Sequence, residues 1–290
     1  MVKIISDSTC DLSPELVNRY DIDILPLHIL LGEKEYKDGK NITPDEIFAW
    51  SDAHKTTPKT SAPSLVDAIK ILKPYVEEKR EVICFSISSS MSTSGNVMRL
   101  AADELEASDF VTVIDSANLS TGIGLQVVEA AVMAQAGKSA AEIKKILTDQ
   151  KLDSSIYITL DTLKYLKKGG RITPAAAAIG TVLNLKPVLQ IQGEKLDAYA
   201  KVRGKKQAKR AMLKAMKNDW ETRFKEYASD GEMCLQAAYT GNLEEAEEFK
   251  KEIQEVFPGM EIHMDPLSLS VACHIGYGAL AVACSRKVTL

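Results

Sequence analysis

The first half of the sequence alternates short apolar segments with helix-start signals, and this alternation limits the fold more than any other feature. The expected strands are residues 2–6, 22–31, 81–87 and 110–115. The expected helices begin at Ser13 and Thr43 and span residues 92–105 and 121–136. Thr43 and Glu46 have the spacing of a capping box. Strands that alternate with helices predict an α/β fold with a mostly parallel sheet and flanking helices.

The second half has a different order of elements. Its expected strands are residues 154–160, 233–239 and 261–264, with a hairpin formed by residues 186–192 and 194–200. Its expected helices are a short one from Asp161 to Gly169-Gly170, an alanine-rich one from Thr173-Pro174, a basic one over 205–217 and an acidic one over 243–256. This order indicates an α+β domain with a mixed sheet. Because 290 residues exceed one ordinary core, we expect two domains, residues 1–152 and 153–290.

Charge and cysteine content argue against several classes of protein. The 36 basic and 40 acidic side chains leave a net charge of −4, so no overall field attracts nucleic acid or an anionic membrane. The five cysteines form no CxxC pair, which argues against disulfides and zinc and favours a reducing cytoplasm. The four histidines are isolated, so no metal site is expected. The first ten residues have too few apolar side chains before Asp7 for a signal peptide to be expected, and no apolar stretch is long enough to predict a membrane span.

Local signatures of catalysis and nucleotide binding fail one by one. Gly137-Lys138-Ser139 resembles the end of a phosphate-binding loop, but Val132 stands where that loop needs its first glycine. The tripeptide is better explained as a helix end followed by the cap of the next helix. No serine stands in a GxSxG or SxxK motif. A serine hydrolase is therefore disfavoured, although triads assemble across the sequence, and no cofactor is expected.

Small polar loops follow the predicted strands and are the remaining candidates for a binding site. They are residues 7–9, 60–64, 88–94 and 115–116. In a parallel sheet, ligands bind beyond the carboxyl ends of the strands, where helix N-termini present free N–H groups. Each loop taken alone is also explained as a helix cap. Together, their hydroxyl groups predict a pocket for one carboxylate or phosphate group, and an apolar part of the ligand would supply further affinity.

The same loops belong to longer motifs that match those of a known protein family. The matching segments in the first half are residues 7–12 (DSTCDL), 36–39 (YKDG), 60–64 (TSAPS, for the family's TSQPS), 88–92 (SSSMS) and 115–116 (DS). The second half adds residues 162–172 (TLKYLKKGGRI) and 183–187 (LNLKP). Together these motifs are highly specific, and through them the chain resembles the DegV family of bacterial fatty-acid-binding proteins over nearly its whole length.

The resemblance implies a two-domain cytoplasmic protein that holds a long-chain fatty acid in a tunnel between its domains. By this analogy, Thr60 and Ser92 would hold the carboxylate. Further contacts to the carboxylate or to an acyl phosphate would come from Ser61, Thr93, Arg171 and His274. The family resemblance also implies a carrier with no catalytic residue of its own, whose bound fatty acid a separate ATP-binding kinase phosphorylates for phospholipid synthesis. Apolar residues between 175 and 185 are candidates to line the tunnel, although a core helix explains most of them.

Two segments depart from the family pattern. Residues 92–96 (STSGN) replace the family's SGTYQ, and Gly95 takes the place of the tyrosine. Residues 274–278 (HIGYG) replace HxGPG, with Tyr277 in place of the proline. Downstream, residues 99–102 (RLAA) match the family without a gap, which keeps Ser92 on the family's key serine. The differences can alter chain selectivity or partner recognition while sparing carboxylate binding.

Two other functions remain open from the sequence alone. One is an acyl hydrolase or transferase with Ser92 as nucleophile and His274 as base, which the missing GxSxG motif disfavours. The other is a binding module for a different amphiphile, and little in the sequence separates it from a fatty-acid carrier. The basic residues 205–210 could dock an acidic partner or a membrane surface, but a solvated helix face is the simpler explanation.

Overall fold

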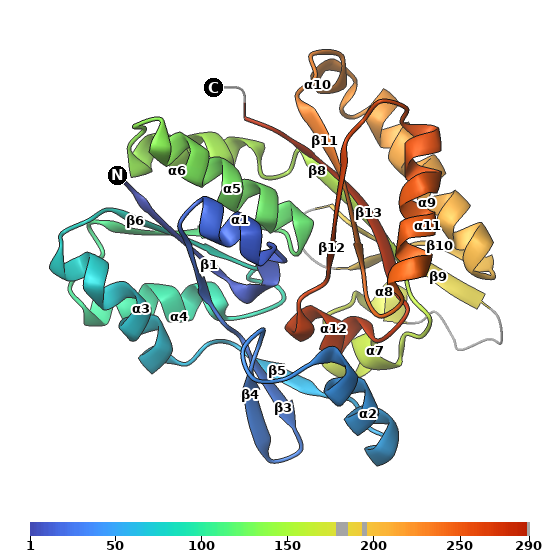
Figure 1. The fold of residues 1–290 in the computed structure, drawn as a ribbon, viewed down its shortest axis with the longest axis horizontal. Helices are drawn as coiled ribbons and strands as arrows, with labels where there is room; N and C mark the ends of the chain where they lie inside the picture. The colour runs from blue at the N-terminus through green and yellow to red at the C-terminus, as the bar shows by residue number, and fades with distance from the viewer. Residues whose placement is uncertain (178–184, 193–195, 289–290) are drawn as a thin grey trace.

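The parallel sheet predicted for the first half is confirmed. The structure, a computed structural model, describes residues 1–177, 185–192 and 196–288. The first sheet has the order β2-β1-β6-β7, with every neighbouring pair parallel. Its strands are β1 (Lys3–Asp7), β2 (Ile22–Leu25), β6 (Val82–Ser86) and β7 (Val111–Asp115). The two central strands, β1 and β6, are buried along their whole length, because helices cover both faces of this sheet (Figure 1).

Successive residues of the central strands enter different cores, as the two-residue period of a strand requires. Ile4 and Ile83 join the core under α5, whereas Ile5 and Cys84 join the core under α3 and α4. The helices around this sheet are α1 (Pro14–Arg19), α3 (Leu65–Glu77), α4 (Ser94–Glu104), α5 (Thr121–Gln135) and α6 (Ala140–Gln150). Ser139 caps α6 in a capping box with Glu142, which confirms that the tripeptide before it is a helix end and a cap.

The second sheet is mixed, as predicted. Its order is β10-β9-β8-β13-β11-β12, and of its described strands only β11 and β12 pair in parallel. The strands are β8 (Ser154–Thr159), β9 (Leu185–Ile191), β10 (Asp197–Arg203), β11 (Met233–Tyr239), β12 (Ile262–Pro266) and β13 (Leu280–Arg286). One face carries α9 (Lys205–Glu221) and α11 (Leu243–Val256), near α10 (Lys225–Ser229) (Figure 1). The other face packs against α5 of the first half.

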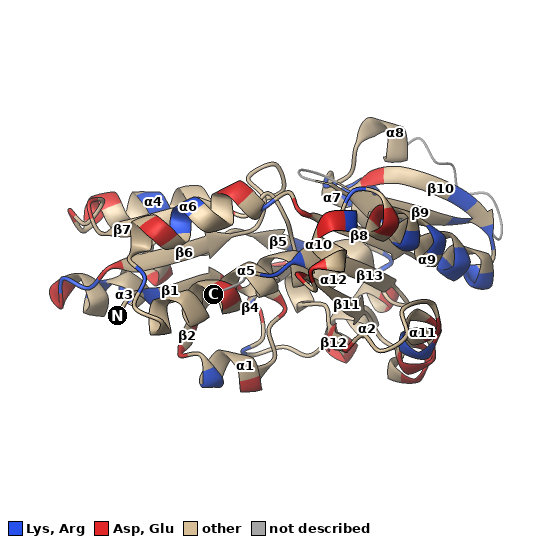
Figure 2. Ribbon diagram, turned by 90° about the horizontal axis from the view of Figure 1, so that it is seen from above, with Lys and Arg blue, Asp and Glu red and all other residues tan. Residues whose placement is uncertain are grey.

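The basic segment at residues 205–210 lies on α9, where Figure 2 shows many lysines and arginines. Two of its lysines form ion pairs with α11: Lys205 Nζ lies 2.6 Å from Glu245 Oε2, and Lys209 Nζ lies 2.5 Å from Glu252 Oε1. Part of this positive charge is therefore neutralised within the molecule.

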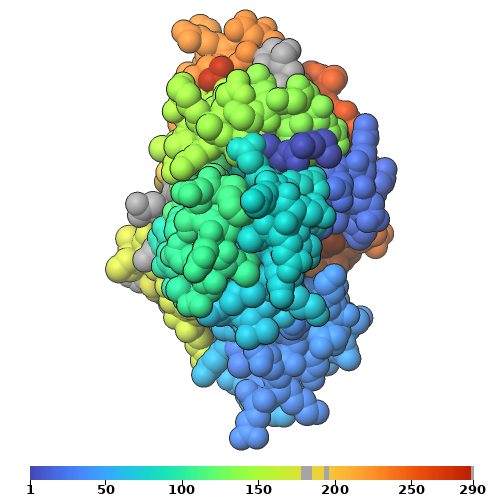
Figure 3. All heavy atoms as spheres, turned by 90° about the vertical axis from the view of Figure 1, so that its left-hand side faces the viewer, coloured from blue at the N-terminus to red at the C-terminus, as the bar shows by residue number. Residues whose placement is uncertain are grey.

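A third, small sheet corrects the prediction of one strand over residues 22–31. The chain leaves the first sheet after β2 and forms β3 (His28–Leu31), which pairs with β4 (Lys34–Lys37) and β5 (Lys59–Ser61). The break falls at Pro26, which has no N–H to donate to a sheet, and at Leu27, whose N–H donates to Ser8 Oγ. With α2 (Pro44–His54), this sheet forms one end of the molecule, at the bottom of Figure 3.

Two short helices, α7 (Lys164–Gly169) and α12 (Leu269–Ile275), lie between the small sheet and the second sheet (Figure 1). A third, α8 (Pro174–Ala177), lies against β10. Asp161 does not cap α7 as predicted, because its carboxylate lies 2.6 Å from Lys186 Nζ and the helix begins only after Leu163. The helix does end at Gly170 in a left-handed conformation, as predicted. The predicted alanine-rich helix from Thr173-Pro174 is described only to residue 177, and residues 193–195 of the predicted hairpin also lie outside the described residues.

Candidate functional site

A cavity of about 460 Å³ lies beyond the carboxyl ends of β1 and β6, where they face α7 and α12. The cavity is lined from both halves of the sequence. All of the site residues predicted from the sequence line it: Thr60, Ser61, Ser92, Thr93, Arg171 and His274. The fold therefore brings together side chains that are up to 214 positions apart in the sequence.

Thr60 and His274 form the closest contact across the cavity. Thr60 lies on β5 at the edge of the small sheet, and its Oγ1 is 2.7 Å from His274 Nε2 on α12. The other ring nitrogen faces Gly169, where a methyl group would overlap the imidazole. Burial, together with the nearby charge of Arg171, lowers the pKa of His274 to about 4. The ring is therefore neutral at neutral pH and can give or accept a hydrogen bond without adding charge.

Arg171 supplies the positive charge of the cavity. Its Nε donates to the carbonyl oxygen of Met91 at 3.1 Å, and its Nη1 donates to the carbonyl oxygen of Gly169. These two bonds join the loop after β6 to the end of α7. Among the described residues, no acidic side chain forms an ion pair with Arg171. Since a guanidinium has five N–H donors, it can still bind an anionic group that enters the cavity.

The loop that carries Ser92 leads into α4. The helix begins at Ser94, two residues later than predicted, and the Ser92 hydroxyl accepts a hydrogen bond from the Ser94 N–H at 3.2 Å. Thr93 occupies the cap position but makes no side-chain cap bond. At Gly95, a Cβ would lie 2.6 Å from Ser86 Oγ. Gly95, which stands where the family has a tyrosine, therefore packs closely against β6.

Three of the four predicted polar loops meet at the cavity, and the fourth lies behind it. Asp115 does not line the cavity, but its Oδ1 accepts from the Ser89 N–H at 3.3 Å and so holds the Ser92 loop. Asp7 acts similarly, because its carboxylate accepts from Thr9 Oγ1 at 2.6 Å and from the Ile87 N–H at 2.9 Å. Burial raises the pKa of Asp7. Both carboxylates therefore organise the loops.

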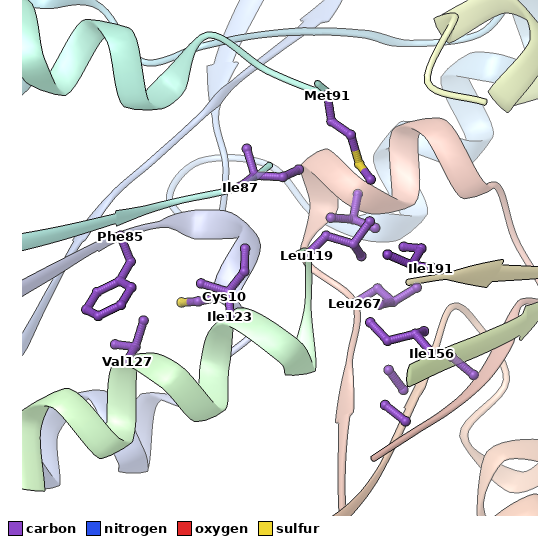
Figure 4. Packing of buried hydrophobic residues seen from close by; sticks show 14 of the residues in the cluster. Cys10, Phe85, Ile87, Met91, Leu119, Ile123, Val127, Ile156, Ile191 and Leu267 are labelled. Carbon is purple, nitrogen blue, oxygen red and sulfur yellow. The ribbon is translucent and has the colours of Figure 1, made fainter. Parts of the chain in front are cut away.

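The opposite end of the cavity is apolar, and the residues that line it were not identified from the sequence. Its walls are Ile87, Leu119, Leu196, Val271 and Ile275. Four of these also line a smaller cavity of about 20 Å³ against the second sheet, together with the side chains of Ile156, Ile158, Ile191, Ala238, Leu267, Ala281 and Ala283. Figure 4 shows Leu119, Leu267 and Ile156 converging there. Residues 175–177 do not line either cavity, and residues 178–184 lie outside the described structure.

The second departure from the family pattern lies away from the cavity. The Tyr277 ring is half exposed and packs edge-on against Phe48 of α2, with ring centroids 5.5 Å apart. It also covers Gly241, whose left-handed backbone leaves no room for a side chain. This tyrosine joins α2 to the second half on the outer surface.

The geometry is suited to holding an anion more than to acid–base catalysis. His274 bonds to Thr60, and in the described part of the chain no hydrogen bond joins it to Ser92. Within the same residues, no group of three or more histidine, cysteine, aspartate or glutamate side chains is placed to hold a metal ion. A search of the described helices finds none that is both long and apolar enough to cross a membrane.

Comparisons with known proteins agree across the whole chain. A family model described as "Uncharacterised protein, DegV family" matches residues 1–287. A DegV domain-containing protein from Deinococcus radiodurans is 31% identical over 285 residues, which is 97% of each chain. A stearic acid-binding protein from Eubacterium ventriosum has a similar structure, with a TM-score of 0.89 and 29% identity over 99% of both chains. A fatty-acid-binding DegV family protein from Thermus thermophilus gives a TM-score of 0.87 and 29% identity, covering 98% of this chain and 99% of its own.

Proposed function

The chain belongs to the DegV family, and from this membership we propose that it binds a long-chain fatty acid in the cavity between its halves. Thr60 and Ser92 hold the carboxylate, and the hydrocarbon chain runs toward the second sheet. The ligand class is supported by the relatives from E. ventriosum and T. thermophilus, which are described as fatty-acid-binding proteins. We also propose a cytoplasmic location and two domains, residues 1–152 and 153–290.

The cavity is polar at one end and apolar at the other, and this observation is the main support for the proposal. One end has hydroxyl groups and the charge of Arg171, which forms no ion pair with an acid of the described residues, and the other is bounded by aliphatic side chains such as Leu119 and Val271. A fatty acid has the same two parts. The carboxylate gains charge-assisted hydrogen bonds at the first end, and the chain leaves water at the second.

The two ends contribute differently to affinity. Each hydrogen bond to the carboxylate is worth roughly 1.5–3 kcal/mol. Burial of about 14 methylene groups, at about 0.8 kcal/mol each, contributes on the order of 11 kcal/mol before ordering costs. The apolar end therefore sets affinity, and the hydroxyl groups fix the position of the carboxylate.

We further propose that the protein presents its ligand to a separate ATP-binding kinase and is not itself an enzyme. The sequence contains no nucleotide-binding motif, so phosphoryl transfer to the carboxylate needs a partner. Ser61 and Gly170, both exposed at the wall of the cavity, mark the side from which a partner can reach the carboxylate. Arg171, His274, Ser61 and Thr93 would contact the acyl phosphate.

The alternative functions have less support. A hydrolase would need Ser92 activated by His274, but the imidazole Nε2 is engaged by Thr60 and Ser92 Oγ accepts from Ser94. A module for a different amphiphile fits the same cavity, and the identity of the bound molecule decides between it and a fatty-acid carrier.

Mass spectrometry of the purified protein tests the ligand class. We expect a co-purified fatty acid at close to one equivalent. Another amphiphile at that occupancy would replace the proposed ligand, and protein that is empty and takes up no added fatty acid would refute the proposal. Ser92→Ala should weaken fatty-acid binding roughly 10- to 100-fold through loss of one bond to the carboxylate. Ser229→Ala, on α10 away from the cavity, is the matched control and should bind as wild type.

A further inference from the structure

The N-terminus of α12 is capped by side chains from the opposite end of the sequence. Its own cap residue, Ser268, makes no side-chain cap bond. Instead, Asp38 Oδ1 accepts from the Leu269 N–H at 3.0 Å, and Asp38 Oδ2 accepts from the Ser270 N–H at 3.1 Å. Asp11 Oδ1 accepts from the Ser268 N–H at 2.8 Å. Three N–H groups that a helix start leaves free are thus satisfied by two distant carboxylates.

Asp38 is itself held in place by the first half of the chain. Ser8 Oγ donates to Asp38 Oδ2 at 2.8 Å and accepts from the Leu27 N–H at 3.1 Å, while the Asp38 N–H donates to the carbonyl oxygen of Leu27. The residue is 4% exposed. The segment after β1 and the segment before β3 thus hold Asp38 on one side. On its other side, the carboxyl group can hold α12 in place.

The helix that these carboxylates hold forms one wall of both cavities. Ser270 and His274 face the polar end, and Val271 and Ile275 line the apolar end and its extension. On its other side, Cys273 packs in the core of the small sheet. A small displacement of α12 would therefore have two effects at once: it would move His274 relative to Thr60, and it would change the shape of the apolar wall.

We propose that Asp38, assisted by Asp11, is a positioning residue that sets α12 and thereby places His274 against Thr60. Its effect on ligand binding rests on the function proposed above, whereas its effect on His274 does not. Asp38 and Asp11 accept these hydrogen bonds at the N-terminus of the helix, where the helix dipole favours a negative charge.

Asp38→Asn tests this role with little change in shape. The amide keeps one oxygen for Leu269, but its NH₂ group would face the N–H of Ser270 and the hydroxyl of Ser8, two donors. We expect the pKa of His274, followed by NMR of the imidazole, to rise from about 4 toward its ordinary value near 6.5 as the ring leaves its buried place beside Arg171. Fatty-acid affinity, measured by calorimetry, should fall about tenfold.

Two internal controls separate positioning from general disruption. His28 lies on β3 of the small sheet, so an unchanged NMR spectrum of its ring at one fixed pH shows that this sheet is intact. Asp52→Asn, an exposed substitution on α2, should leave both measurements at wild-type values. If Asp38→Asn does not fold, Ser8→Ala takes its place, because it removes one support of Asp38 and should give smaller changes of the same sign.

The outcomes distinguish the two proposals. An unchanged His274 titration in a folded Asp38→Asn protein would overturn the positioning role, whatever the affinity. A shifted titration with unchanged fatty-acid affinity would support positioning and refute the placement of the carboxylate at Thr60 beside His274. Wild-type protein that binds no fatty acid would refute the proposed function, while the His274 titration would still decide the role of Asp38.

Discussion

At the scale of single residues, a glycine decides where the cavity's histidine can stand. Gly169 is the last residue of α7, and the His274 ring occupies the space that a Cβ would take. Its backbone is helical and does not need a glycine for conformational reasons, since it is absent from the positive-φ positions. The requirement for glycine is therefore one of space, imposed by a residue about a hundred positions away.

Gly169→Ala should accordingly displace His274 without harming α7, because alanine favours a helix more than glycine does. We expect overpacking to lower the free energy of unfolding by about 1–3 kcal/mol, together with weaker fatty-acid binding, measured by calorimetry, and a changed imidazole spectrum for His274. Lys168→Ala, at the exposed neighbouring position, is the control. Wild-type affinity and an unchanged spectrum in Gly169→Ala would show that the ring is not held by this contact.

Residues of the site differ in how far the sequence can identify them. Thr60, Ser92, Arg171 and His274 stand in motifs that the resemblance singles out, and all line one cavity. Asp38 also lies in such a motif, but its partners are backbone N–H groups more than 230 positions away, and no local pattern predicts them. Motifs identify chemistry, whereas the carboxylates that hold the loops and α12 are recognised only from geometry.

At the scale of elements, α5 contains a half-buried acid, Glu129, that makes stability depend on pH. Glu129 accepts a hydrogen bond from the Val288 N–H, and burial raises its pKa to about 7. Its protonated form is thus favoured in the folded state relative to the unfolded chain, where the pKa is near 4.3. Its contribution to stability is full below that unfolded value and is lost as the pH rises through about 7.

Lowering the pH from 8 to 6 should therefore raise the free energy of unfolding by roughly 1 kcal/mol through Glu129. Asp11, whose pKa burial also raises to about 7, acts in the same direction. Glu129→Gln should reduce this pH dependence in denaturant titrations. Glu142→Gln is the control, since hydrogen bonds from Ser139 lower the pKa of Glu142 and leave it charged throughout this range. An equal slope in wild type and Glu129→Gln would contradict the assignment.

The sequence predicts well those elements whose own segment contains the capping residues and the regular spacing of apolar residues. Ser139 and Thr43 each form a capping box at the start of the helix that follows them, α6 and α2. By contrast, α12 was not predicted, because its cap comes from Asp38 and Asp11 and not from its own segment. Strand β13 was also missed: it is alanine-rich and nearly all buried, so it shows neither strong strand propensity nor alternation.

At the scale of the whole molecule, the packing of the two halves sets the length of the apolar space. Ala281 on β13 lines the smaller cavity and is 4% exposed. Ala281→Leu should fill this space and shift the bound fatty acids toward chains shorter by about two carbons, since each lost methylene contact weakens binding about fourfold. Mass spectrometry after exchange with a mixture of saturated fatty acids measures the shift. Ala53→Leu, exposed on α2, should keep the wild-type preference.

An unchanged chain-length profile in Ala281→Leu would place the end of the hydrocarbon chain elsewhere. The sequence could not have suggested this position, because the side chains around the smaller cavity come from β8, β9, β11, β13 and α12. The order of elements predicts both sheets, but the face that each sheet turns toward the other depends on contacts between distant segments.

The place of α12 in the chain has a consequence for biosynthesis. A ribosome releases the N-terminal sheet and the Thr60 loop long before residues 269–275, yet the cavity lacks one wall until that helix docks beside the small sheet. The binding proposed for this cavity must then wait until residues 269–275 have left the ribosome. A nascent chain stalled before α12 would expose the apolar wall formed by Ile87 and Leu119, which makes it a natural client for chaperones.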